Sequence, residues 1–191
     1  IDLRDLAKGG PAYKRCLVLG HITDEKGRKM SKSLGNGIDP LEVVDTYGAD
    51  AMRFTLVFLA SQGQDILIDM ESFKLGSKFA NKIWNAARYL LMNMEGRKIF
   101  ALEECSLKPV DRWILHQLNE AAAAVETGIT GYRFNDAAGA VYEFFWNDFC
   151  DWYIEASKLS LYSEDEAEKN RSVTILMAIL EEAMRLAHPF L

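Results

Sequence analysis

Four long segments repeat their hydrophobic residues with the period of an α-helix, and this feature constrains the fold most strongly. These segments are residues 71–94, 109–127, 135–161 and 164–188. The pattern Ser163-x-x-Glu166 predicts a capping box at the start of the last one. Residues 95–106 lack the period, so we expect a linker there. The chain should be mainly α-helical and should contain a helical bundle.

The first seventy residues contain shorter elements. A strand is predicted around residues 15–19, and alternating apolar residues predict a brief strand within residues 66–70. The run Asp39-Pro40-Leu41-Glu42 combines an N-cap acid, a proline at the first helical position and an acid at N3. We therefore expect a short helix that ends near Gly48, followed by a second helix over residues 50–60.

Aromatic residues recur at helical spacing within the 135–161 segment. One side of this helix contains Tyr142, Phe145, Phe149, Trp152 and Ala156. Because no lysines are interleaved with them, we expect bundle core here and not a platform for stacking bases. The other side contains Asp148, Asp151 and Glu155. No histidine joins these carboxylates, so a solvated acidic face is expected and a metal site is not.

Composition excludes several classes of protein. The chain has 191 residues, of which 49% are hydrophobic, enough to bury on the order of 70% of its unfolded surface. No apolar run approaches the roughly 18 residues of a membrane span, and no signal-peptide pattern is present, so a cytoplasmic protein is expected. Cys16, Cys105 and Cys150 are scattered, which predicts buried free thiols and neither disulfides nor a zinc site.

A short basic run contains the residues best suited to a polyphosphate. It follows a predicted turn at residues 24–27 and consists of Lys29, Met30, Ser31, Lys32 and Ser33. Lysines supply compact positive charges, hydroxyls donate hydrogen bonds, and flanking glycines let the backbone adjust. A solvated basic loop is the alternative for such a run. We predict that it binds ATP.

Charge is unevenly distributed along this acidic chain, whose net charge is −6. Residues 1–35 contain eight basic and four acidic residues, and residues 71–102 contain six basic and two acidic. By contrast, residues 103–191 contain seven basic and sixteen acidic. The two basic segments are therefore the expected sites of contact with a nucleotide and with RNA.

The 71–94 helix has a polar side that could bind RNA. Cations for phosphates, amides for riboses or base edges and an aromatic ring for stacking are found there. These candidates are Lys78, Asn81, Lys82, Asn85, Arg88 and Tyr89. An ordinary solvated helix face, with a tyrosine whose hydroxyl reaches water, is the alternative.

The basic run and several other segments resemble a known enzyme family. Lys-Met-Ser-Lys-Ser, with Leu-Gly-Asn after it, is similar to the KMSKS signature of class I aminoacyl-tRNA synthetases. Further segments resemble the valyl branch of that family, and the resemblance spans nearly the whole chain. They are residues 47–53, 63–66, 81–89, 111–115 and 149–155.

This resemblance implies a fold and an arrangement of domains. It implies the end of a Rossmann-type catalytic domain with the signature loop over residues 1–38. A stem-contact region with a connecting helix would follow over 39–106, and a truncated anticodon-binding helical bundle over 107–191. The family's other ATP signature, a His-x-Gly-His motif, is absent from the sequence. We therefore expect a fragment that cannot activate valine by itself.

The resemblance also implies a reaction and its partners. The intact enzyme would activate valine with ATP, accompanied by Mg²⁺, and then transfer it to tRNA(Val). Lys32 and then Lys29 would stabilise the charge that develops on the phosphates, Ser31 and Ser33 would shape the loop, and Met30 would pack against the protein. The helix at 71–94 would contact the anticodon arm. The alternatives are an isoleucyl-tRNA synthetase fragment and a non-catalytic helical RNA-binding module.

Overall fold

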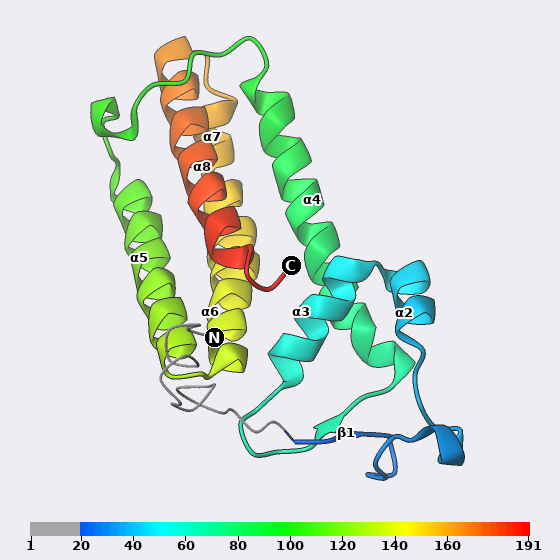
Figure 1. The fold of residues 1–191 in the computed structure, drawn as a ribbon. Helices are drawn as coiled ribbons and strands as arrows, with labels where there is room; N and C mark the ends of the chain where they lie inside the picture. The colour runs from blue at the N-terminus through cyan, green and yellow to red at the C-terminus, as the bar shows by residue number, and fades with distance from the viewer. Residues whose placement is uncertain (1–19) are drawn as a thin grey trace, which may run out of the picture.

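The computed structural model describes residues 20–191, in which a small mixed module is joined to a helical bundle (Figure 1). The strand predicted at residues 15–19 and Cys16 lie outside the described residues. Cys150 is buried and Cys105 is partly exposed, and both are free thiols. Among the described residues, no helix is long and apolar enough to cross a membrane.

The N-terminal module is built around two very short parallel strands. Strands β1 (Ile22–Thr23) and β2 (Ile66–Leu67) pair in the register Ile22 with Ile66. The short 3₁₀ helix η1 (Lys32–Leu34) and helices α2 (Pro40–Tyr47) and α3 (Ala49–Leu59) lie between them in the chain, and a second short 3₁₀ helix, η2 (Met70–Phe73), follows β2. Val43, Ile66, Ile68 and Phe73 form a buried hydrophobic cluster in this module.

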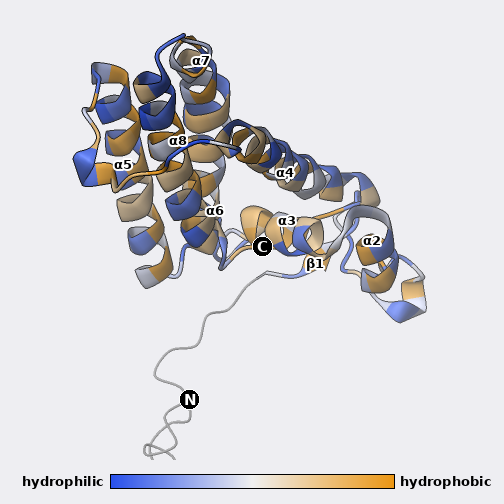
Figure 2. Cartoon of the chain, turned by 90° about the horizontal axis from the view of Figure 1, so that it is seen from above, coloured by the Kyte–Doolittle hydropathy of each residue, from blue (hydrophilic) through white to orange (hydrophobic). Residues whose placement is uncertain are grey.

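Long helical rods form the bundle (Figure 1). They are α4 (Lys74–Met94), α5 (Pro109–Thr130), a continuous rod made of α6 (Phe134–Glu143), η4 (Phe144–Ile154) and α7 (Glu155–Leu161), and α8 (Glu166–Ala187). The expected linker contains only the short η3 (Leu102–Glu104). Hydrophobic and hydrophilic residues alternate along α4, α5 and α8 (Figure 2), as amphipathic helices require. The predicted helices are thus confirmed.

The helix caps agree with the sequence in one place and differ in another. The Asp39 side chain accepts a hydrogen bond from Leu41 N at 2.9 Å, and Pro40 is the first residue of α2, as predicted. The predicted capping box at Ser163 is wrong. Asp165 is the N-cap of α8 and accepts from Ala167 N at 2.9 Å, whereas the Ser163 hydroxyl accepts from Asp165 N. Asp165 lies directly before the helix and carries a negative charge, so it binds the free amides of the first turn better than the Ser163 hydroxyl does.

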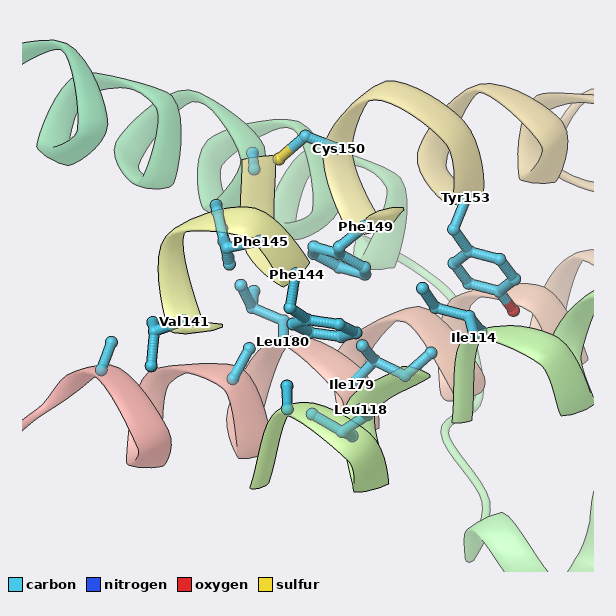
Figure 3. Packing of buried hydrophobic residues seen from close by; sticks show 14 of the residues in the cluster. Ile114, Leu118, Val141, Phe144, Phe145, Phe149, Cys150, Tyr153, Ile179 and Leu180 are labelled. Atoms are coloured by element: carbon cyan, nitrogen blue, oxygen red, sulfur yellow. The ribbon is translucent and has the colours of Figure 1, made fainter. Parts of the chain in front are cut away.

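The prediction that Trp152 faces the bundle core is wrong. The middle part of the central rod, η4, is wound as a π-helix, which takes more residues per turn than an α-helix. The buried stripe therefore continues from Phe145 and Phe149 to Tyr153, while Trp152 is 68% exposed. In Figure 3, Phe149 and Tyr153 point from this rod into the core, near Ile114 of α5. Ala156, which was predicted to share the stripe, is also exposed.

Close packing of α3 against α4 joins the two parts of the molecule. A Cβ atom on Gly76 would lie 2.3 Å from the carbonyl oxygen of Ala51, so only glycine fits at this crossing. Nearby, the Phe54 and Phe79 rings are 4.5 Å apart, and Phe79 meets Phe145 of the central rod edge to face at 6.0 Å. These aromatic contacts fix the bundle relative to the N-terminal module.

A buried carboxylate joins three helices of the bundle. Asp111, at the start of α5, is only 3% exposed. It accepts hydrogen bonds from the Tyr153 hydroxyl at 2.7 Å, from Lys108 N at 2.8 Å and from the Arg171 guanidinium of α8. Arg171 also pairs with Glu168 at 2.8 Å and lowers the pKa of that carboxyl to about 2. All of these polar groups are satisfied, as a buried ionic network requires.

We predict that Asp111→Ala destabilises the protein by about 3–5 kcal/mol, because Arg171 would keep its charge without its buried partner. Tyr153→Phe removes only one hydrogen bond and should cost about 1–2 kcal/mol. Urea unfolding followed by circular dichroism measures both losses. Asp151→Asn, at an exposed ion pair, is the matched control and should cost less than 1 kcal/mol. Equal losses of unfolding free energy for Asp111→Ala and Asp151→Asn would show that Asp111 is not the buried partner that Arg171 requires.

Candidate nucleotide loop and nucleic-acid interface

Backbone pairing and one apolar side chain hold the basic loop on the N-terminal module. Lys29 pairs with Thr23 across an isolated antiparallel bridge, and Met30 N donates to Ile22 O at 3.1 Å. The Met30 side chain packs against the cluster around Val43 and Ile68, as the sequence predicted. The base of the loop is therefore fixed.

Hydrogen bonds of the Asn36 side chain, called here the Asn36 latch, close the loop, and the sequence did not predict them. The Asn36 side-chain oxygen accepts from Ser31 N at 2.9 Å, while its amide nitrogen donates to Asp24 at 3.0 Å and to Lys29 O at 3.4 Å. Asp24 also accepts from Arg28 Nε at 2.8 Å, and these donors lower the pKa of Asp24 far below its usual range. The turn predicted at residues 24–27 is confirmed by the bond from Gly27 N to Asp24 O.

The tip of the loop presents its cations to solvent. Ser31 caps η1 by accepting from Leu34 N at 3.3 Å, and its hydroxyl lies 3.1 Å from that of Ser33. Gly35 ends η1 with a φ of 61°, a left-handed conformation that favours glycine. Lys29 and Lys32 are both exposed. The structure thus brings two cations and two hydroxyls together on one short projection.

Helix α4 presents a basic face to solvent along its length. Exposed residues at helical spacing of three or four include Lys78, Asn81, Asn85 and Arg88. The helix contains four basic residues and no acidic ones, in contrast to the acidic remainder of the bundle. Trp84, which sequence reasoning did not select, is also 69% exposed on this helix. A polyanion could therefore bind along this face.

Two of the predicted RNA-binding residues also contact other parts of the bundle. Lys82 pairs with Asp151 of the central rod at 2.6 Å and lies 4.9 Å above the Trp146 ring. The Tyr89 hydroxyl is 3.4 Å from that of Tyr162, so this ring is partly buried and does not project from the middle of the polar side. Burial raises the pKa of Tyr89 above its usual range. Packing against the central rod holds both side chains at the edge of the basic face.

The acidic residues of the central rod take part in separate local interactions. Asp151 binds Lys82, Glu155 binds Lys158 at 2.7 Å, and Asp148 lies 3.5 Å from the Gln117 amide. Partial burial raises the pKa of Asp148. Within residues 20–191, no group of three or more potential ligands is arranged to hold a metal ion.

Two family models match this chain in consecutive segments. The model described as tRNA synthetases class I (I, L, M and V) matches residues 5–69, and the anticodon-binding domain of tRNA ligase matches residues 111–191. The chain belongs to the class I tRNA synthetases. Its signature loop lies in the first match, and the basic helix α4 lies between the two matches.

Curated relatives of this synthetase chain are valine–tRNA ligases. That of Treponema pallidum (strain Nichols) is 60% identical over 94% of the chain, which covers 19% of the relative. That of Thermotoga maritima is 56% identical over 89% of the chain, again covering 19% of the relative. The synthetase chain thus spans about a fifth of the length of these relatives.

Solved class I synthetases have the same fold. The Agrobacterium radiobacter K84 LeuRS, in a ternary complex with tRNA and LeuAMS, is 27% identical with a TM-score of 0.72, over 90% of this chain and 20% of that one. A Mycobacterium tuberculosis methionyl-tRNA synthetase in complex with methionyl-adenylate is 24% identical with a TM-score of 0.77, over 97% and 38%. The mainly α-helical fold class predicted from the sequence is confirmed.

We predict that Asn36→Ala makes the signature loop of this synthetase chain more mobile. Loss of the bond from Ser31 N should speed hydrogen exchange at that amide by about five- to tenfold, as expected for one hydrogen bond of about 1 kcal/mol. Exchange followed by nuclear magnetic resonance measures the effect. Asn85→Ala, which removes an asparagine side chain from the exposed face of α4, is the control. Unchanged exchange at Ser31 in Asn36→Ala would contradict the latch.

Proposed function

We propose that this chain is part of a valine–tRNA ligase that activates valine with ATP and transfers it to tRNA(Val). The observation that carries this proposal is the 60% identity to such a ligase over 94% of the chain, with the signature loop intact. The relatives described above favour the valyl over the isoleucyl assignment. They also favour an enzyme over a non-catalytic RNA-binding module.

The signature loop would act on the phosphates of ATP. Attack of the valine carboxylate on the α-phosphate places negative charge on phosphate oxygens, and positioned cations lower the energy of that state. Lys32 and Lys29 are exposed on a projection with a fixed base, so they could meet this charge. Ser31 and Ser33 would shape η1 or donate hydrogen bonds to phosphate. Mg²⁺ would accompany ATP, held mainly by its phosphates.

The basic face of α4 would contact the anticodon arm of the tRNA. Lys78 and Arg88 are its exposed cations and would neutralise phosphates, while Asn81 and Asn85 would reach riboses or base edges. Lys82 and Tyr89 would join them from the edge of the face, Lys82 after leaving Asp151. Residues 1–38, 39–106 and 107–191 remain our proposed catalytic, stem-contact and anticodon-binding parts, and we place the enzyme in the cytoplasm.

Lys32→Ala, introduced into a synthetase of the relatives' full length, should slow valyl-adenylate formation by about 10²–10³-fold, the loss typical of one transition-state donor. The affinity for tRNA should stay unchanged. Rapid-quench adenylate formation and tRNA binding are measured in parallel. Lys26→Ala, an exposed lysine on the preceding turn, is the control and should leave the rate within about twofold. Equal slowing in both variants would show a general charge effect and overturn the proposed role.

Arg88→Gln should weaken binding to cognate and non-cognate tRNA about equally, because a phosphate contact reads no sequence. The slope of log affinity against log salt should become shallower by roughly one unit. Binding isotherms at several salt concentrations test this. Arg185→Gln on α8, whose guanidinium pairs with Glu181, is the control and should change neither quantity. An unchanged slope in Arg88→Gln would show that this face is merely solvated.

A further inference from the structure

A cleft opens where the N-terminal module meets the bundle. Its volume is about 540 Å³, which is within the range of ligand pockets. Residues from α3, β2, η2, α4 and the central rod line it. They include Leu67, Glu71, Lys74, Lys78, Tyr142 and Trp146. The cleft lies at the junction between two modules, where ligand sites are common.

The floor of the cleft is apolar and contains aromatic rings. Tyr142 and Trp146 stack with ring centroids 5.4 Å apart and an angle of 24° between their planes, and each ring is partly exposed. Leu67 of β2 is 58% exposed at the same cleft, which is a large exposure for an apolar residue. The Lys82 ammonium also lies 4.9 Å from the centre of the Trp146 ring. A flat, weakly polar group such as a nucleobase could therefore lie against Leu67 and the parts of the two rings that these contacts leave exposed.

The rim of the cleft is basic. Lys74 and Lys78 line it from the first turns of α4, and Glu71 is its one acidic residue. Lys74 pairs with Glu71, so Lys78 supplies the uncompensated positive charge. Lys78 is exposed and has no ion-pair partner among the described residues. This charge complements a phosphate group and repels another cation.

The position of the cleft also favours RNA. Lys78 belongs both to the cleft and to the basic face of α4, so the two surfaces are continuous. Helix α4 is about 30 Å long at 1.5 Å per residue. Its first turns line the cleft, and the helix runs from α3 along the bundle (Figure 1). At the other end of the cleft, β2 pairs with β1, which leads into the signature loop. A tRNA that reaches both the loop and the bundle would pass the cleft.

We propose that this junction cleft binds one unpaired nucleotide of the tRNA. Its base would lie against Leu67 and the Tyr142–Trp146 pair, and its phosphate would contact Lys78. The inference rests on the proposed tRNA-binding function and adds a contact outside the signature loop, at a cleft formed by both matched segments and by α4 between them.

The test places a carboxylate in the cleft and compares it with the same change outside both the cleft and the basic face of α4. Leu67→Glu should weaken tRNA binding by about tenfold, because it removes an apolar contact and repels phosphate. Leu159→Glu, at an α7 residue that is 86% exposed and does not line the cleft, should change affinity by less than twofold. Fluorescence anisotropy with labelled tRNA measures both, and circular dichroism checks that each variant is folded.

A second measurement locates the contact on the RNA. An iron chelate attached to Leu67→Cys should cleave the bound tRNA at one or two adjacent unpaired nucleotides, whereas the same chelate on Leu159→Cys should not cleave there. Normal affinity of Leu67→Glu together with no localised cleavage would overturn the proposal. Failure of the unmodified chain to bind tRNA would instead remove the proposed function on which it rests.

Discussion

The ion pair between Asp111 and Arg171 is the interaction on which the bundle depends. It joins the start of α5 to α8, and the Tyr153 hydroxyl adds the central rod to the same carboxylate. Burying two charges is costly, and such a pair is tolerated only where further hydrogen bonds satisfy both groups. Here Lys108 N and Glu168 complete the network. The pair therefore favours one relative placement of three helices over alternatives in which a charge would be buried alone.

Helix α4 connects the bundle to the N-terminal module. Its first turns pack against α3 through Gly76 and Phe79, and its later turns contact the central rod through Lys82 and Tyr89. One helix thus belongs to both parts of the molecule. Its remaining face is free of acidic residues and faces solvent. The same element that holds the two parts together is therefore the surface best suited to RNA.

The sequence predicted the helices well because their hydrophobic period is regular and their ends contain recognisable caps such as Asp39. It could not predict the π-helical winding of η4, which depends on tertiary packing and turns Trp152 into solvent. The partners of Lys82 and Tyr89 come from residues about seventy positions away, so spacing within α4 could not reveal them. For the loop, the motif identified the cations, but the Asn36 latch required the fold.

The salt dependence of tRNA binding by the unmodified chain tests this account most directly. Two or three phosphate contacts along α4 predict that log affinity falls linearly with log salt, with a slope of roughly −2 to −3. Acidic residues dominate the rest of the bundle, so no other surface of the bundle offers this charge. A slope near zero, or affinity that rises with salt, would contradict the assignment of α4 as the RNA-binding face.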